Sequence, residues 1–332
     1  MQLIWRSPIA AGVALWSTLV ERRLFAIRRH ALPVLGEGAA PLRVLQLSDL
    51  HLAPWQSQKI DWVRSLAALR PDLLVLTGDL MGHVQARASL VHALRPLAES
   101  GAPAVFVHGS NDYYGPILKN PLKYLREPSR KSTRHQDIDN ARLTASLTDE
   151  LGFTDLNNSA TRIEARGSVL DLFGLNDPHI RYDDAAAMRQ ARAAQRSDEG
   201  AGAASAADAY SDAAAGSSGA AGSDDAAGSS DAVRIGVVHA PYQQALGELL
   251  GEGADLILAG HTHGGQVRVP GVGALTANCD LPTQQARGLS VWYDAQRAAY
   301  LNVSAGLGNS IYAPVRFACR PEASLITLEA AR

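Results

Sequence analysis

Short apolar runs recur along the chain, and several of them end in polar residues. Runs of four to six apolar residues bounded by turn-forming residues are typical of buried strands. Five runs of this kind predict strands at residues 42–47, 73–76, 104–107, 234–238 and 256–259. Weaker runs predict strands at 161–164 and 169–173. Near the carboxyl end we expect the strands of a second layer, at residues 267–269, 288–292, 299–303 and 323–328.

Segments with helical periodicity separate several of these strands. Between residues 57 and 69, Ile60, Val63 and Leu66 recur at the spacing of one helix face, and Pro71 ends the segment. Further helices are expected at residues 86–99, 141–151 and 242–250. Strands that alternate with helices in this way are typical of an α/β fold.

The composition changes abruptly between residues 183 and 232, where the chain is mostly Ala, Ser, Gly and Asp. Residues 183–196 could continue as a helix, but the remainder has too little apolar surface to offset the entropy lost on ordering. We therefore predict a disordered insertion at 183–232. The expected organisation is a helix and a lead-in strand in residues 1–40, followed by one domain over 41–332 that contains this insertion.

An apolar run near the amino terminus, residues 9–20, is followed by the four arginines Arg22, Arg23, Arg28 and Arg29. The run is shorter than the roughly 20 residues that span a bilayer, and it lacks a clear signal-peptide cleavage site. One interpretation is a helix on a membrane surface; the other is a helix packed on the protein's own core. In the membrane interpretation, which we favour slightly, the apolar side carries Trp5, Leu15, Trp16, Leu19 and Leu24. The expected location is cytoplasmic, with peripheral attachment to the inner face of the cell membrane.

The formal net charge of the 332-residue chain is −2, which implies no general attraction to nucleic acid. Cys279 and Cys319 are too few for a disulfide scaffold, so two free, buried thiols are expected. One irregular stretch, residues 116–139, is strongly basic. It could receive an anionic substrate or be a solvated loop, and its cations are Lys119, Lys123, Arg126, Arg130, Lys131 and Arg134.

Residues able to bind a metal follow all five of the stronger predicted strands. In order along the chain they are Asp49, His51, Asp79, Asn111, His239, His261 and His263. Ligands bind outside the carboxyl ends of strands in α/β sheets. Imidazole and carboxylate groups together suit manganese, iron or zinc. The sequence therefore predicts a metal site at this edge.

The order and spacing of these residues resemble the calcineurin-like metallophosphoesterase superfamily. The similarity extends over residues 41–328 outside the insertion. Three longer matches resemble a bacterial branch that includes membrane-associated phosphodiesterases: Ser48-Asp49-Leu50-His51-Leu52, Gly260-His261-Thr262-His263-Gly264-Gly265-Gln266 and Pro314-Val315-Arg316-Phe317.

The resemblance implies a four-layer α/β/β/α sandwich with two divalent or transition-metal ions, whose identity as Mn, Fe or Zn stays open. By matching position, Asp49, His51 and His263 would hold one ion. Asn111, His239 and His261 would hold the other, and Asp79 would bridge both. A water shared by the two ions would attack phosphorus in line as hydroxide. No Gly-X-Ser-X-Gly nucleophile motif is present.

One turn departs from the family pattern Gly-Asn-His-Asp/Glu, because here it is Gly109-Ser110-Asn111-Asp112. Aligned without a gap, Asn111 takes the place of the catalytic histidine. With a shift of one residue, which we favour, Asn111 remains a metal ligand. In either alignment the usual acid is missing, and His108 or His179 could replace it; each could also be a structural histidine.

The expected activity is hydrolysis of phosphate esters, with phosphodiesters that carry a lipid or nucleotide-like headgroup favoured as substrates. A metal-binding but inactive scaffold is the alternative from another class, and the altered turn is the feature in its favour. A nuclease of the same superfamily is the third hypothesis, which the near-neutral charge does not support.

Overall fold

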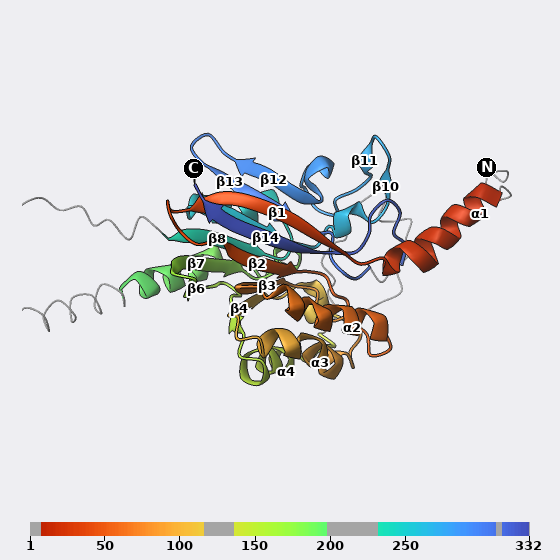
Figure 1. Cartoon of the computed structure of the whole chain (residues 1–332), viewed down its shortest axis with the longest axis horizontal. Coiled ribbons are helices and arrows are strands. Elements are labelled where there is room, and N and C mark those ends of the chain that lie inside the picture. The colour runs from red at the N-terminus through yellow and green to blue at the C-terminus, as the bar shows by residue number, and fades with distance from the viewer. Residues whose placement is uncertain (1–7, 116–135, 198–231, 310–313, 332) are drawn as a thin grey trace, which may run out of the picture.

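Two six-stranded sheets face each other at the centre of the molecule (Figure 1). The computed structural model describes residues 8–115, 136–197, 232–309 and 314–331. Trp5, the six cations of the basic stretch and residues 198–231 of the predicted insertion lie outside the described residues. Within the insertion, residues 185–197 form a helix, as the sequence allowed.

The first sheet carries three of the strands after which metal-binding residues were predicted. Its central strands run parallel to one another, whereas β14 runs antiparallel to β2 and parallel to β1. In spatial order the strands are β1 (Ala26–Leu35), β14 (Glu322–Ala330), β2 (Leu42–Leu47), β3 (Leu73–Thr77), β4 (Ala104–Val107) and β5 (Thr154–Asp155).

The second sheet carries the other two of those strands. Its four central strands are parallel, and an antiparallel strand closes each edge. In spatial order the strands are β12 (Gly288–Tyr293), β13 (Ala298–Val303), β9 (Leu256–Ala259), β8 (Val233–Val238), β7 (Ser168–Leu175) and β6 (Ser159–Ala165).

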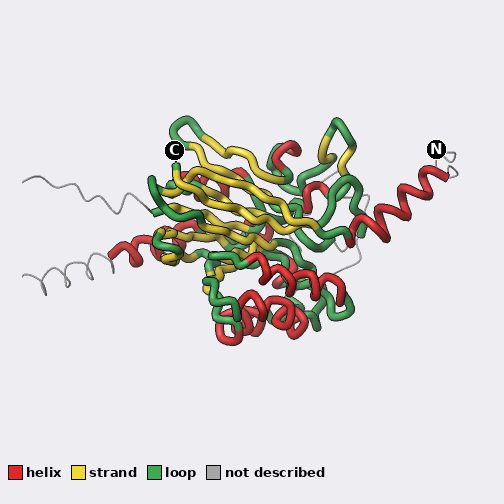
Figure 2. The backbone as a smooth tube through the Cα atoms, in the orientation of Figure 1, coloured by secondary structure: helices red, strands yellow, loops and turns green. Residues whose placement is uncertain are grey.

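Helices cover the outer face of each sheet, so the architecture is the predicted four-layer α/β/β/α sandwich (Figure 2). The first sheet packs against α2 (Ser57–Ser65), α3 (Arg87–Ala98) and α4 (Asn140–Ala145) with its continuation Ser146–Glu150. The second sheet packs against α6 (Gln243–Gly251) and the helix at residues 185–197.

Burial on both faces explains why the central strands are continuous apolar runs. In β3, Leu73 and Val75 belong to the core between the sheets, while Leu74 and Leu76 belong to the core under the helices. Successive side chains of a strand point to opposite faces, so a strand inside a four-layer sandwich needs apolar residues at every position. Each strand therefore ends abruptly where the chain turns polar.

The expectation that all the carboxyl-terminal strands form the second layer is wrong for two of the four. Strands β12 and β13 do join the second sheet, but β14 lies in the first, between β1 and β2. The predicted strand at 267–269 pairs as β10 (Arg268–Val269) only with β11 (Gly273–Ala274) in a small hairpin. An apolar pattern predicts that a strand is buried but does not identify its partner, because both sheets offer the same environment.

The amino-terminal helix projects from one end of the molecule (Figure 1). It consists of α1 (Pro8–Leu15), a wider turn over Trp16–Val20 and a tight turn over Glu21–Arg23. Leu15 is 60% exposed and Leu19 is 50% exposed, so the interpretation in which these side chains pack on the protein's own core is wrong. No helix within the described ranges is long and apolar enough to cross a bilayer.

The base of this helix is nevertheless fixed to the body. The amide of Arg316 donates a hydrogen bond to the carbonyl of Ser17, and the Glu21 carboxylate accepts one from the amide of Cys319. Both cysteines are free thiols, as predicted; Cys319 is buried and Cys279 is half-buried.

Candidate metal centre

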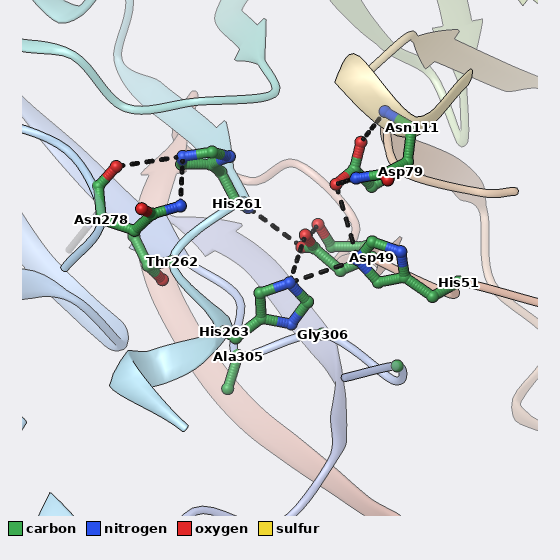
Figure 3. A network of polar contacts seen from close by, with 12 residues as sticks. Asp49, His51, Asp79, Asn111, His261, Thr262, His263, Asn278, Ala305 and Gly306 are labelled. Atoms are coloured by element: carbon green, nitrogen blue, oxygen red, sulfur yellow. Dashed lines mark hydrogen bonds and ion pairs between the residues drawn. The ribbon is translucent and has the colours of Figure 1, made fainter. Parts of the chain in front are cut away.

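The carboxyl ends of β2, β3, β4, β8 and β9 converge at one edge of the sandwich, and the predicted ligands gather there (Figure 3). Two buried groups have ligand atoms that all lie within 4.8 Å of one another. They are Asp49 with His51 and His263, and Asp49 with Asp79 and His239. Residues from distant parts of the sequence therefore form one cluster.

The first group is built from the ends of β2 and β9. The Nε2 atoms of His51 and His263 are 3.2 Å apart, and the two rings are stacked. His263 Nε2 lies 3.6 Å from Asp49 Oδ1, and His51 Nε2 lies 3.5 Å from Oδ2 of Asp79. The two imidazoles thus face the Asp49 carboxylate, and an Asp79 oxygen lies beside His51.

The second group is built around the other oxygen of the same Asp79 carboxylate. Asp79 Oδ1 lies 3.5 Å from His239 Nε2, which in turn lies 3.3 Å from His261 Nδ1. Because its two oxygens face different groups, Asp79 lies between them as a bridging carboxylate must. His261 completes the second group through its contact with His239.

Backbone and amide groups orient two of the imidazoles. His239 Nδ1 lies 2.8 Å from the carbonyl oxygen of Thr77, and a carbonyl can only accept, so this nitrogen carries the proton. His261 Nε2 lies 3.2 Å from the carbonyl oxygen of Asn278. The contact with Thr77 leaves the lone pair of His239 Nε2 directed at the cluster, which is the arrangement a metal ligand needs. The Asn278 amide nitrogen also lies 3.2 Å from His261 Nε2, so Asn278 holds this ring in place in either tautomer.

One oxygen of the cluster has no hydrogen-bond donor to satisfy it. Asp49 is fully buried, and its Oδ2 accepts bonds from Ser48 Oγ at 2.6 Å and from the His261 amide at 3.0 Å. Its Oδ1, which faces His263, has no hydrogen-bond partner within the described chain. A buried anionic oxygen that faces imidazole lone pairs is costly unless a cation lies between them. The residues present therefore fit bound metal ions.

The pKa shifts of the histidines also favour a bound cation in the cluster. Burial lowers the pKa of His51 to about 4 and holds those of His261 and His263 well below their usual value, so all three are neutral at pH 7. Burial alone would lower the pKa of His239, but the facing Asp79 carboxylate raises it well above its usual value. A positive charge is thus favoured between His239 and Asp79, and a proton or a metal ion can supply it.

The backbone at the candidate ligands is strained. Five of the seven have positive φ angles, a region that side chains other than glycine rarely adopt: Asp49 (47°), His51 (38°), Asp79 (52°), His261 (67°) and His263 (50°). In an extended strand, residues two apart point the same way. Asp49 and His51 instead converge through left-handed backbone conformations. Each such residue costs about 1–2 kcal/mol, and clusters of them mark functional sites.

A glycine allows the two sheets to meet this closely. A Cβ atom at Gly260 would overlap Ser48 Oγ and lie 2.6 Å from Asp49 Oδ2. Any side chain at this position would displace the carboxylate from the cluster. The glycine that precedes His261 is thus required by the fit of β9 against β2.

The altered turn after β4 brings Asn111 to both oxygens of the Asp79 carboxylate. Its amide nitrogen Nδ2 lies 2.7 Å from Asp79 Oδ2, and its backbone N–H donates to Asp79 Oδ1 at 2.8 Å. Asp112 holds the turn in place, since its carboxylate accepts bonds from the amides of Gly109, Leu80 and Met81. Rotation of the Asn111 amide by half a turn would present its oxygen, the atom that binds metals.

The two candidate acids lie in different surroundings. His108 is buried, and its ring contacts Thr144, Asp112, Phe106 and Tyr113, none of which is a candidate ligand. His179 lies against the cluster, with its ring centroid 4.5 Å from that of His261. The structure thus brings His179, and not His108, to the side of the second group.

Other residues of the centre carried no sequence signal that singled them out. Asp177 follows β7, is fully buried, and has an Oδ2 atom without a hydrogen-bond partner among the described residues. Burial raises the pKa of Asp177 to about 7. The position of Asp177 after a strand could have suggested it. Thr77 orients His239 through its backbone carbonyl, and a backbone contact of this kind leaves no signal in the sequence.

Comparison with known proteins identifies relatives over most of the chain. A family model described as calcineurin-like phosphoesterase matches residues 42–265. Phosphodiesterase YaeI of Escherichia coli (strain K12) is 26% identical over 308 residues, which are 92% of this chain and 88% of that protein. Uncharacterized protein YpbG of Bacillus subtilis (strain 168) is 24% identical over 304 residues, or 91% and 87% of the two chains.

Solved structures with a similar course of the chain are more distant. One is TT1561 of Thermus thermophilus, with a TM-score of 0.41 and 13% identity over 81% of this chain and 91% of that one. Another is the phosphopantetheinyl hydrolase PptH of Mycobacterium tuberculosis. Its TM-score is 0.39 and its identity 13%, over 84% of this chain and 96% of that one.

Proposed function

Since the chain belongs to the calcineurin-like phosphoesterase family, we propose that it hydrolyses phosphodiesters at two metal ions held between the ends of its sheets. Metal-dependent phosphoester hydrolysis follows from the family itself. Preference for diesters is the finer step, and its support is the 26% identity to phosphodiesterase YaeI over nearly the whole chain. We further propose that two ions are bound and that they are manganese, iron or zinc.

The observation that carries the proposal is the position of Asp79. Its Oδ2 faces His51 and its Oδ1 faces His239, each at 3.5 Å, so one carboxylate serves both groups. In the proposed assignment Asp49, His51 and His263 hold one ion, and Asn111, His239 and His261 hold the other. When bound, the two ions supply a water of lowered pKa and offset the charge that develops on the phosphate oxygens.

Burial of the cluster strengthens the electrostatic interactions available to the reaction. The cluster is almost fully buried, so charges there interact more strongly than in water. In the overall reaction water forms a new P–O bond, the ester P–O bond breaks, and the alcohol leaves with a proton. The products are a phosphate monoester and an alcohol.

We assign delivery of that proton to His179. Its Nδ1 lies 2.9 Å from the hydroxyl of Tyr242, and its ring lies over that of His261. Burial raises the pKa of Tyr242, so its hydroxyl stays protonated and can hold the imidazole in place. The catalytic histidine missing from the turn at Asn111 would thus be replaced from the carboxyl end of β7.

His179→Gln is expected to slow hydrolysis in a way that depends on the leaving group. Loss of a general acid costs about 10²–10⁴-fold when the leaving alcohol needs a proton and little when it does not. We therefore predict at least about a 100-fold loss for methyl phenyl phosphate and less than about threefold for bis(4-nitrophenyl) phosphate. Equal losses on both would show that His179 only supports the structure. The matched control is His92→Gln, on the exposed side of α3.

The proposed activity is tested directly with bis(4-nitrophenyl) phosphate and 4-nitrophenyl phosphate after loading with manganese. The expected result is a kcat/KM for the diester at least about tenfold above that for the monoester. A reversed preference would assign a monoesterase. Full metal content without activity on either compound would favour the inactive scaffold.

The exposed amino-terminal helix supports attachment to an anionic bilayer. Leu15, Trp16 and Leu19 are exposed on a segment that ends in Arg22 and Arg23. Apolar side chains followed by cations fit the boundary between acyl chains and headgroups. The cytoplasmic face is the compartment proposed for this contact.

Vesicle binding should depend on the apolar side chains of this helix. The double variant Leu15→Asp, Leu19→Asp is expected to reduce cosedimentation with phosphatidylglycerol–phosphatidylcholine vesicles at least about tenfold. Tyr293→Asp, at an exposed site on β12, is the control. Unchanged binding of the double variant would exclude the helix as the membrane contact.

A further inference from the structure

A cleft of about 650 Å³ connects the base of the amino-terminal helix with the metal centre. His51, a candidate ligand, forms part of its wall, and so do Arg22 and Arg23. Lys59 of α2 and Trp55 in the loop before that helix also line it. A molecule in the cleft would thus touch both the centre and the helix base.

The cleft carries positive charge that no acidic residue balances within the described chain. The groups that shift the pKa of Arg22 are burial and the neighbouring Arg23, with no carboxylate among them. Glu21 is nearby in sequence, but its carboxylate is occupied by the Trp16 indole at 2.9 Å and the Cys319 amide at 2.6 Å. The arginines therefore face the cleft without a counter-ion from the described residues.

Lys59 adds a buried cation to the same wall. The residue is only 7% exposed, and its Nζ donates to the Leu50 carbonyl at 2.7 Å. Burial and the charges of Arg316 and Arg22 lower the pKa of Lys59 to about 7. A buried lysine that faces other cations is unfavourable unless an anion joins them, because buried charges are normally paired.

Asn309 provides a further donor. It lines the cleft, and its Nδ2 is buried without a hydrogen-bond acceptor among the described residues. An anion in the cleft would offer this amide an acceptor oxygen. The Asn309 amide and the cations of the cleft therefore both favour an anion with several acceptor oxygens.

The lining of the cleft includes one large exposed aromatic side chain, Trp55. Trp55 is 70% exposed, and its ring packs edge-on against that of His83, with the two ring centroids 4.9 Å apart. Large aromatic rings at such a position are typical of the boundary between water and lipid. The chain leads from Arg22 and Arg23 directly into the exposed apolar residues of α1.

We propose that this cleft binds the phosphate-bearing headgroup of a bilayer lipid, with Arg22, Arg23 and Lys59 around the anion and the acyl chain directed along α1. Hydrolysis of that lipid at the centre beyond His51 rests on the proposed phosphodiesterase activity; binding of the lipid does not. A small anion in water would use the cations but not Trp55 or the exposed apolar residues of α1. A lipid uses both.

The test compares the affinity of the full-length protein for three probes by titration calorimetry. Dodecyl phosphate below its critical micelle concentration has the chain and the anion, inorganic phosphate has only the anion, and dodecyl maltoside has only the chain. Wild type is expected to bind dodecyl phosphate at least about tenfold more tightly than either other probe, because each partial probe loses one set of contacts. The affinity for dodecyl phosphate should fall at least about tenfold in the double variant Arg22→Gln, Arg23→Gln.

The control is Arg95→Gln, an exposed arginine of α3 that does not line the cleft. Thermal unfolding shows whether each variant is folded, and the surface arginines avoid the risk attached to the buried Lys59. Equal affinities for dodecyl phosphate and inorganic phosphate would overturn the lipid assignment in favour of a small anion. Unchanged affinity in the double variant would exclude the cleft. Neither outcome depends on catalysis, so failure of the phosphodiesterase proposal would be seen separately, as absent metal and absent turnover.

Discussion

Asp79→Asn is expected to lower kcat/KM for bis(4-nitrophenyl) phosphate at least about 1,000-fold and to remove most of the bound metal. The carboxylate lies between the two groups, with one oxygen 3.5 Å from His51 and the other 3.5 Å from His239. Loss of a single electrostatic contact to a transition state commonly costs about 10²–10³-fold, and here the bridge between both ions is lost as well. Turnover and metal content are measured on the same preparation.

Asp61→Asn is the matched control, because Asp61 is an exposed carboxylate on the neighbouring helix α2. It should retain wild-type turnover and metal content. An Asp79→Asn protein that keeps full metal content and loses less than about tenfold in kcat/KM would contradict a bridging role for this carboxylate.

Arg316→Met is expected to destabilise the fold by about 3 kcal/mol, the second large effect. The guanidinium group is fully buried and donates to the carbonyl oxygens of Ala305, Gly306, Gly308 and Cys319. Hydrogen bonds from a charged donor contribute about 1.5–3 kcal/mol each, and the abandoned carbonyls would be left buried without partners. For a domain of this size the midpoint of thermal unfolding should fall by roughly 5 °C.

The same loop supports the metal centre, so metal affinity should fall as well. The amides of Leu307 and Gly308 donate to the carbonyls of Ser48 and Asp49, which fixes the position of the latter residue. The control is Arg320→Met, an exposed arginine that also bonds two carbonyls, those of Leu24 and Phe25. A midpoint that falls no more for Arg316→Met than for Arg320→Met would contradict the supporting role.

Much of the architecture could be predicted from sequence because burial on both faces leaves a clear pattern. Strands such as β3 and β9 are apolar at nearly every position, and each is followed within a few residues by a candidate ligand. The position of β14 could not be predicted, since its apolar pattern suits either sheet. Its partners are decided by the pairing with β1 and β2, which is a property of the assembled sandwich.

The candidate ligands could be named from sequence, but their geometry could not. Asp49 and His51 converge through left-handed backbone conformations, which an apolar or polar pattern does not encode. Lys59 lies in the segment predicted as a helix at residues 57–69, and nothing in the sequence singled it out. Only the structure shows that Lys59 is close enough to Arg22 and Arg316, which are far away in the chain, for their charges to lower its pKa. Long-range charge relations of this kind require the structure.

The choice between His108 and His179 shows the same limit. Both follow predicted strands and looked equivalent in sequence. The fold turns His108 toward Thr144 and away from the cluster, and it places His179 over His261. Only the second position suits delivery of a proton to a leaving group at the centre.

The most direct test of the account is the metal content of the purified wild-type chain, measured by inductively coupled plasma mass spectrometry after manganese, iron and zinc have each been supplied. The two groups, with an Asp79 oxygen facing each of them, predict close to two ions per chain for at least one of these metals. No bound metal under any of the three conditions would contradict the assignment of all seven ligands and with it the proposed mechanism.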